Sequence, residues 1–175
     1  TVGGRYSIWS PISLSAALEN NFSKFLNGGL SADRMLLGDT KIDLQYQKLI
    51  KILAFSDLWF SNFLNKKNRV VLSYNWKLRS LQSYIQQLEM ESLGKKANPK
   101  SIFKETGQSI FGGFGSTAQH SYFQLLHQGT AEFCTDIIYS TSVNSPLSSA
   151  QAKGQAAILS SDFKGSANLL EKTNS

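Results

Sequence analysis

Three groups of polar residues in this sequence have the types and spacing that could perform chemistry. The first is Gly3-Gly4-Arg5-Tyr6-Ser7, which comes just before an expected helix. Two glycines let the backbone approach a ligand closely, and the Arg5 guanidinium could hold a negative charge that develops on that ligand. The alternative is an ordinary glycine turn with a surface arginine.

The second group is residues 86–92, expected at the C-terminal end of a helix. Gln87 and Glu91 are four residues apart, so they share one helix face. Because that face lies close to the expected apolar stripe, the Glu91 carboxylate could be partly removed from water, as a general base requires. A solvated helix end is the alternative, and it is the interpretation that we adopt for Glu89.

The third group is a glycine-rich segment that leads to His120. It is not a phosphate loop, because no Gly-Lys-Ser/Thr ends it, and its glycines lack the spacing of a dinucleotide loop. His120 is expected at a loop-to-helix junction, where an imidazole could transfer a proton. His127 lies within the expected helix and is interpreted as structural. No Cys, His and carboxylate spacing indicates a metal site, so neither a metal nor another cofactor is expected.

These groups need elements to position them, and the pattern predicts strands alternating with helices. The expected strands are 69–72, 101–103, 109–111 and 133–139, and the expected helices include 44–63, 76–90, 117–127 and 150–170. Such alternation predicts an α/β fold, a three-layer αβα Rossmann-like sandwich with a parallel sheet. Ligands of such sheets bind at the carboxyl ends of the strands, where we expect all three groups.

Some local expectations follow from glycines and apolar residues. Residues 5–18 are expected to form a loop that leads into a helix, and Asn27-Gly28-Gly29 is expected to end that segment. Residues 112–115 are expected to form a loop. Helix 44–63 is apolar almost all round, which predicts burial on most sides.

Composition excludes several classes of protein. The 41% apolar content is enough for a core, and no stretch reaches the roughly 18 to 20 apolar residues that span a bilayer. The net charge of +6 comes from scattered Lys and Arg residues, which argues against a nucleic-acid partner. The single cysteine, Cys134, suits a reducing cytoplasm and is expected in the core. The opening residues 1–5 are typical of the interior of a longer protein.

Taken together and in this order, three segments resemble the signatures of the phosphoglucose isomerase family. They are residues 2–10 (Val-Gly-Gly-Arg-Tyr-Ser-Ile-Trp-Ser), 86–95 (Gln-Gln-Leu-Glu-Met-Glu-Ser-Leu-Gly-Lys) and 115–130, which contains Gln119-His120. Weaker similarity lies at 58–63 and 134–138. The resemblance therefore covers residues 1 to about 170, the second half of such an enzyme.

The resemblance implies a role for each matching residue. Glu91 matches the base that moves a proton between C1 and C2 of the sugar through a cis-enediol, and Arg5 matches the cation that stabilises the enediolate. His120 matches the histidine that assists ring opening and that reaches into the partner's site in a homodimer. Gln87 matches a substrate-binding glutamine, and Gly4 matches a backbone contact to the substrate.

The resemblance also implies domains, a substrate and limits. Residues 1–40 would be the tail of a first sugar-isomerase (SIS) domain with a linker, and 41–175 a second, truncated one. The reaction would interconvert glucose 6-phosphate and fructose 6-phosphate without nucleotide or metal, in the cytoplasm and without nucleic-acid or membrane partners. The family's phosphate-binding cluster would precede residue 1 and its ring-opening lysine would follow Ser175, so this fragment is expected to be inactive alone.

One departure from the family leaves an alternative open. Many members have Glu-Pro-Gly-Thr-Asn where this chain has residues 113–117, Gly-Phe-Gly-Ser-Thr. With the missing segments, this change at Ser116-Thr117 is compatible with a non-catalytic sugar-phosphate-binding module on the same fold. The presence of Arg5, Glu91 and His120 favours the isomerase, because a sensor needs no base aligned with C1 and C2.

Overall fold

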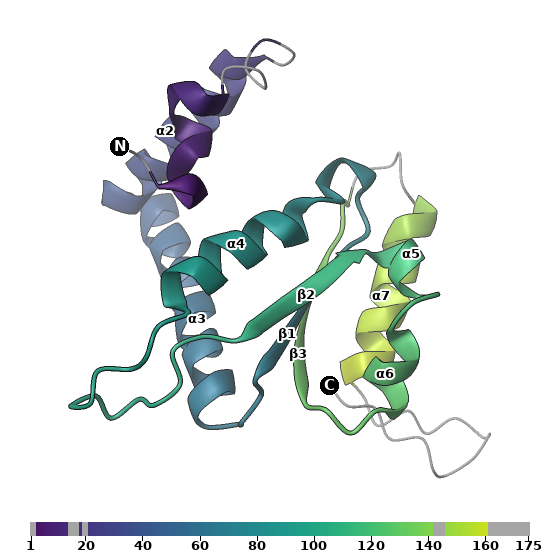
Figure 1. Cartoon of the computed structure of the whole chain (residues 1–175). Coiled ribbons are helices and arrows are strands. Elements are labelled where there is room, and N and C mark those ends of the chain that lie inside the picture. The colour runs from purple at the N-terminus through teal and green to yellow at the C-terminus, as the bar shows by residue number, and fades with distance from the viewer. Residues whose placement is uncertain (1–2, 14–17, 19–20, 142–145, 161–175) are drawn as a thin grey trace. The chain divides into compact units, whose positions relative to one another are not determined.

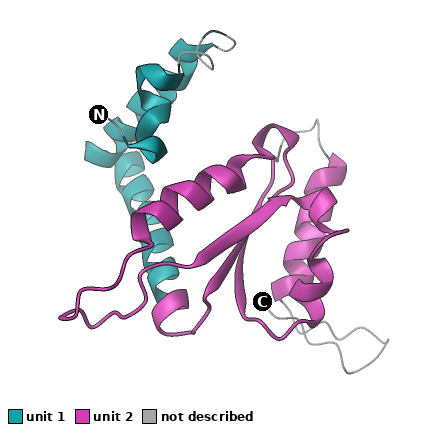
Figure 2. Cartoon of the chain, in the orientation of Figure 1, with its two compact units in different colours: residues 1–59 teal, residues 60–175 magenta. Residues whose placement is uncertain are grey.

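The computed structural model describes residues 3–13, 18, 21–141 and 146–160. The chain divides into two compact units, residues 1–59 and residues 60–175, shown in different colours in Figure 2. The predicted boundary at 40/41 separates two sugar-isomerase domains of the family, and it stays a prediction. Each unit is described by itself below.

Unit 1 begins with two 3₁₀ helices, η1 (Gly4–Trp9) and η2 (Pro11–Ser13), and continues with α2 (Phe22–Leu37). The expected helix stop at Asn27-Gly28-Gly29 is wrong, because α2 runs through all three residues. The Trp9 ring stacks on Phe25 with centroids 4.5 Å apart and lies where a Gly29 side chain would be. Glycine within this helix therefore makes room for an aromatic ring. Residues 14–17, where the first expected helix begins, lie outside the described residues.

Helix α3 (Lys41–Asn62) confirms the helix expected at 44–63. It begins at a capping box, in which the Thr40 N–H donates to Asp43 Oδ2 at 3.1 Å and the Asp43 N–H donates to Thr40 Oγ1 at 3.3 Å. The predicted burial is wrong, because large apolar side chains along α3, among them Phe55 and Trp59, are more than half exposed. Helical pattern fixes the conformation of a segment, but burial depends on what packs against it.

The described part of unit 2 contains a three-stranded parallel sheet, which confirms the predicted α/β fold (Figure 1). The strands are β1 (Asn68–Ser73), β2 (Ser109–Phe114) and β3 (Phe133–Ile138), in the order β2-β1-β3. Val70, Val71 and Leu72 of the central strand β1 are fully buried. A central parallel strand is covered on both faces, which explains its unbroken apolar run.

Helices cover both faces of this sheet, as Figure 1 shows. Helix α4 (Leu81–Leu93) lies on one face, and α5 (Gly115–Ala118), α6 (Phe123–Gln128) and α7 (Pro146–Ser160) lie on the other. The main core forms on the second side, from the residues Val70, Leu72, Tyr74, Ala118, Phe123, Leu126, Phe133, Ala152 and Leu159.

The loop expected at 112–115 is wrong, since Gly112 and Gly113 belong to β2. Gly112 pairs with Val71 of β1 and has a φ of +145°, a conformation that side chains disfavour. A β-carbon at Gly112 would also collide with the Val71 carbonyl oxygen. The glycines thus permit close strand pairing here rather than a loop.

Three further expectations differ from the structure. The helix expected at 117–127 is broken by a turn at 119–122, between α5 and α6. The strand expected at 101–103 is part of an irregular connection. The helix expected at 76–90 is divided into a 3₁₀ turn, η3 (Trp76–Leu78), and α4. Of the helix expected at 150–170, the part beyond Ser160 lies outside the described residues.

Candidate active site

Gln87 and Glu91 lie together on one face of α4, as their spacing predicted. The opposite face packs on the sheet, where Gln86 Nε2 donates to the Ile110 carbonyl oxygen at 2.6 Å. Glu89 also lies on the sheet side, and its side chain projects about 160° from that of Glu91 around the helix axis. Gln87 and Glu91 are therefore exposed in this unit rather than partly buried.

This pair lies at the amino ends of the strands, not at the carboxyl ends where we expected it. Strands β1 and β2 are parallel, so the helix that connects them runs back along the sheet. The C-terminal turn of α4 consequently reaches the start of β2, where the Ile110 N–H lies 3.4 Å from Met90 Sδ. The polar composition of this segment does not reveal the direction of its helix, which decides the end of the sheet at which Gln87 and Glu91 lie.

His120 lies at the other end of the sheet, as expected. It is exposed in the turn that follows α5, and α5 begins directly after the carboxyl end of β2. The backbone at Gly115 lies against the ring of Tyr74, the residue that follows β1. A six-residue strand is about 20 Å long, so Glu91 and His120 are separated by roughly the length of the sheet.

The structure therefore does not bring all the predicted site residues together within one unit. Glu91 and Gln87 share one end of unit 2, whereas His120 lies at the opposite end. Arg5 and Gly4 belong to unit 1, in η1. The Arg5 guanidinium lies 4.9 Å from the centroid of the Tyr6 ring, which supports it from one side.

A chain of polar side chains supports the turn that carries His120. Gln151 Nε2, on α7, donates to Gln119 Oε1 at 2.7 Å, and Ser116 Oγ donates to Gln151 Oε1 at 3.2 Å. Gln119 Nε2 also contacts the Tyr74 hydroxyl at 3.5 Å. Ser116, one of the residues that depart from the family pattern, therefore contributes a contact to this turn.

Two tyrosines near this turn are not acid–base groups at neutral pH. Burial, and then the neighbouring Tyr74, raise the pKa of Tyr122 to about 12. Burial also raises the pKa of Tyr74, against a smaller opposing effect of its hydrogen bond with Gln119. Both hydroxyls therefore keep their protons at neutral pH.

Sequence reasoning missed an ionic cluster that attaches α4 to the sheet. Arg69, on β1, donates from Nη1 to Glu89 Oε1 and Oε2 at 3.0 and 3.1 Å, and from Nε to Asp136 Oδ2, on β3, at 2.8 Å. The Arg69 side chain is 12% exposed and that of Glu89 is 29% exposed. The solvated interpretation of Glu89 is therefore wrong. Sequence spacing could not reveal these pairs, because they join residues 20 and 67 positions apart.

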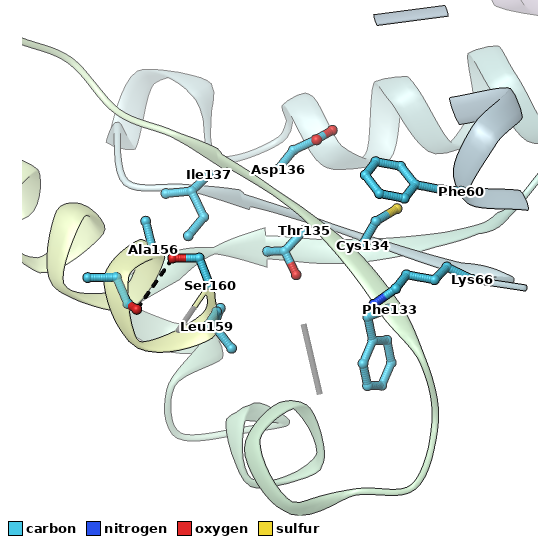
Figure 3. A pocket seen from close by; sticks show the side chains of 11 residues that line it. Phe60, Lys66, Phe133, Cys134, Thr135, Asp136, Ile137, Ala156, Leu159 and Ser160 are labelled. Atoms are coloured by element: carbon cyan, nitrogen blue, oxygen red, sulfur yellow. Dashed lines mark hydrogen bonds between the residues drawn. The ribbon is translucent and has the colours of Figure 1, made fainter. Parts of the chain in front are cut away.

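A pocket of about 620 Å³ lies along β3 and the last turn of α7 (Figure 3). Both of its charged side chains are engaged in ion pairs, Lys66 with Glu132 at 3.3 Å and Asp136 with Arg69 at 2.6 Å. Gln87, Glu91 and His120 are not among the residues that line it. The pocket is therefore separate from the predicted site.

The part of the chain that the structure describes contains no group of three or more His, Cys, Asp or Glu side chains that could hold a metal ion. Among the described helices, none combines the length and the apolar character needed to cross a membrane.

Comparison with known protein families shows which family this chain belongs to. The family model described as phosphoglucose isomerase matches residues 1–174. The chain belongs to the phosphoglucose isomerase family. This confirms the resemblance that the three sequence segments indicated.

Relatives within the phosphoglucose isomerase family agree with this assignment. The glucose-6-phosphate isomerases of Shewanella pealeana and Shewanella amazonensis are 40% and 41% identical over 151 residues, which is 83% of this chain and 27% of each relative. The crystal structure of a glucose-6-phosphate isomerase from Chlamydia trachomatis matches 90% of this chain and 33% of its own length, with a TM-score of 0.75 at 27% identity. The chain thus spans about a quarter to a third of the proteins it resembles.

Proposed function

We propose that this chain is a segment of an aldose–ketose isomerase that interconverts glucose 6-phosphate and fructose 6-phosphate through a cis-enediol. The observation that carries the proposal is the family match over residues 1–174. The three segments that hold Arg5, Glu91 and His120 all lie within that match. A carboxylate can serve as the base for proton transfer next to a carbonyl, a cation can stabilise the enediolate, and an imidazole can assist ring opening.

Each residue has a distinct role in this proposal. Glu91 removes the proton at C2 of the aldose and returns it at C1, while Gln87, one helical turn away, binds the substrate beside it. Arg5 stabilises the negative charge of the enediolate, and the backbone at Gly4 contacts the substrate. His120 assists opening of the sugar ring. No step requires a metal or a nucleotide.

The separation of Glu91 from His120 supports a homodimer. If each site takes Glu91 from one subunit and His120 from its partner, the two residues can lie at opposite ends of one sheet and still serve the same reaction. We therefore propose that the active protein is a homodimer with shared sites. A cytoplasmic location is proposed as well, from the substrate and the single buried thiol, Cys134.

A coupled assay on the purified full-length protein tests the function. Turnover of fructose 6-phosphate, measured by oxidation of the glucose 6-phosphate formed, is expected for the full-length protein. The isolated 175-residue chain serves as a control and should show no turnover, because it spans only about a quarter to a third of the length of the relatives it matches. A full-length protein that binds the sugar phosphate without turnover would instead indicate a non-catalytic binding module.

His120→Ala is expected to lower kcat/KM for the cyclic sugar phosphate far more than for an open-chain analogue, because only the cyclic substrate needs ring opening. Measuring kcat/KM for both substrates checks this. His127→Ala provides a matched control, since His127 is half-buried with its ring 5.9 Å from that of Phe123. It should lower the melting temperature without distinguishing the substrates. Equal losses for both substrates in His120→Ala, with a lower melting temperature, would make His120 structural.

A further inference from the structure

The sheet-facing side of α4 is polar close to Glu91. Gln86 donates to the Ile110 carbonyl oxygen, and Glu89 accepts two hydrogen bonds from Arg69. Apolar contacts tolerate small rotations and shifts of a helix, whereas directional hydrogen bonds fix one rotation and one position along the sheet. Polar groups at these positions therefore determine where the opposite face of α4 points.

We propose that Arg69 and Glu89 are positioning residues for Glu91, and this inference rests on the proposed isomerase function. Arg69 Nη1 donates to both carboxylate oxygens of Glu89. Its Nη2 and Nε lie 2.6 and 2.8 Å from Asp136 Oδ2. Because Asp136 fixes the guanidinium from the side of β3, Arg69 is a rigid anchor that joins α4 to two strands.

Arg69 binds α4 close to the end of the helix that carries Glu91. Glu91 lies in the last turn of the helix, which ends at Leu93 with the Gly94 N–H donating to the Met90 carbonyl oxygen at 2.9 Å. The ends of helices fray more readily than their centres. Glu89 is paired with Arg69 of the sheet two residues before Glu91, so this ion pair holds the last turn of α4 in register with the sheet.

Glu89→Ala in the full-length protein tests the proposal. This variant removes the ion pair between Arg69 and Glu89, while Arg69 keeps its pair with Asp136. We expect kcat to fall about tenfold or more and KM to stay within about twofold of wild type. The reason is that misplacing a catalytic group by about 1 Å can cost about 10²-fold in rate. Glu89→Gln keeps an oxygen acceptor for Arg69 and should recover part of the loss.

Glu105→Ala provides the matched control. Glu105 also forms an ion pair, a single contact of 2.6 Å with Lys67 between two exposed side chains, and it lies outside α4. This variant should keep kcat within about twofold of wild type, as expected for loss of an exposed pair.

A double variant distinguishes positioning from general stability. If Glu89 acts through Glu91, then Glu89→Ala should have no further effect once Glu91→Gln has removed the base, because residues that act as a unit are not additive. The same fold loss in both backgrounds, or an unchanged kcat in Glu89→Ala, would overturn this inference while the wild type remains an isomerase. A wild type without isomerase activity would overturn the proposed function as well.

Discussion

Glu91→Gln in the full-length protein is expected to lower kcat about 10² to 10⁴-fold, which is the usual cost of losing a positioned general base. The amide keeps the shape of the carboxylate, so binding of the sugar phosphate should remain close to that of wild type. Proton exchange between C2 and solvent should be lost to the same extent, because exchange and isomerisation share the enediol. Exchange measured by NMR in deuterated water, together with kcat and Kd, checks the expectation.

Glu89→Gln is the informative comparison for this result, because it makes the same chemical change two residues away. Glu89 faces Arg69 and not the substrate side of α4, so its amide variant should lose far less activity than Glu91→Gln. The assignment of the base to Glu91 would be wrong if Glu91→Gln kept more than roughly a tenth of wild-type kcat, where a base normally contributes at least about 10². It would also be wrong if Glu89→Gln were the more damaging change.

Mixing two inactive variants is expected to restore activity, because the sites are proposed to be shared between subunits. In a dimer of a Glu91→Gln subunit and a His120→Ala subunit, one site has both defects and the other combines an intact Glu91 with an intact His120. Random assortment makes about half of the dimers mixed, so about a quarter of wild-type activity should return.

Two different affinity tags allow the mixed dimers to be isolated, and their kcat per dimer should be about half that of wild type. Each variant refolded alone, in the same way, is the control and should remain inactive. If isolated mixed dimers stay as inactive as their parents, Glu91 and His120 act within one subunit. Glu91 and His120 of the same subunit would then have to reach a common site, which the arrangement of unit 2 does not allow.

Sequence alone predicted the family, the parallel α/β fold and the strands β1 and β3, because these depend on local patterns. The run Val70-Val71-Leu72 is short and fully buried and contains two β-branched valines, so pattern and structure agree. The pair Gly112-Gly113 is typical of a loop, and local sequence cannot show that the backbone of Val71 lies against Gly112. Gly29 is typical of a helix end, and local sequence cannot show that the Trp9 ring packs against it.

The candidate site was predictable as a set of residues but not as an arrangement. Signature segments point to Glu91 and His120, and their roles stay predictions. Their placement at opposite ends of the sheet follows from the direction of α4, which only the order and pairing of the strands determine. The ion pair between Arg69 and Glu89 could not be predicted from the sequence. A helical pattern does not distinguish a charged residue in water from one that is paired with a residue of the sheet.

Cys134 gives this chain a chemical reporter at the pocket along β3. It is the single cysteine in the sequence, is 8% exposed, and lies on the edge strand β3, where Gln108 Nε2 contacts its sulfur at 3.1 Å. Cys134 also lines the pocket along β3, so a thiol reagent that enters this pocket can reach the sulfur in the folded chain. The labelling rate therefore reports access to the pocket without any engineered probe, and a molecule that fills the pocket should slow the labelling.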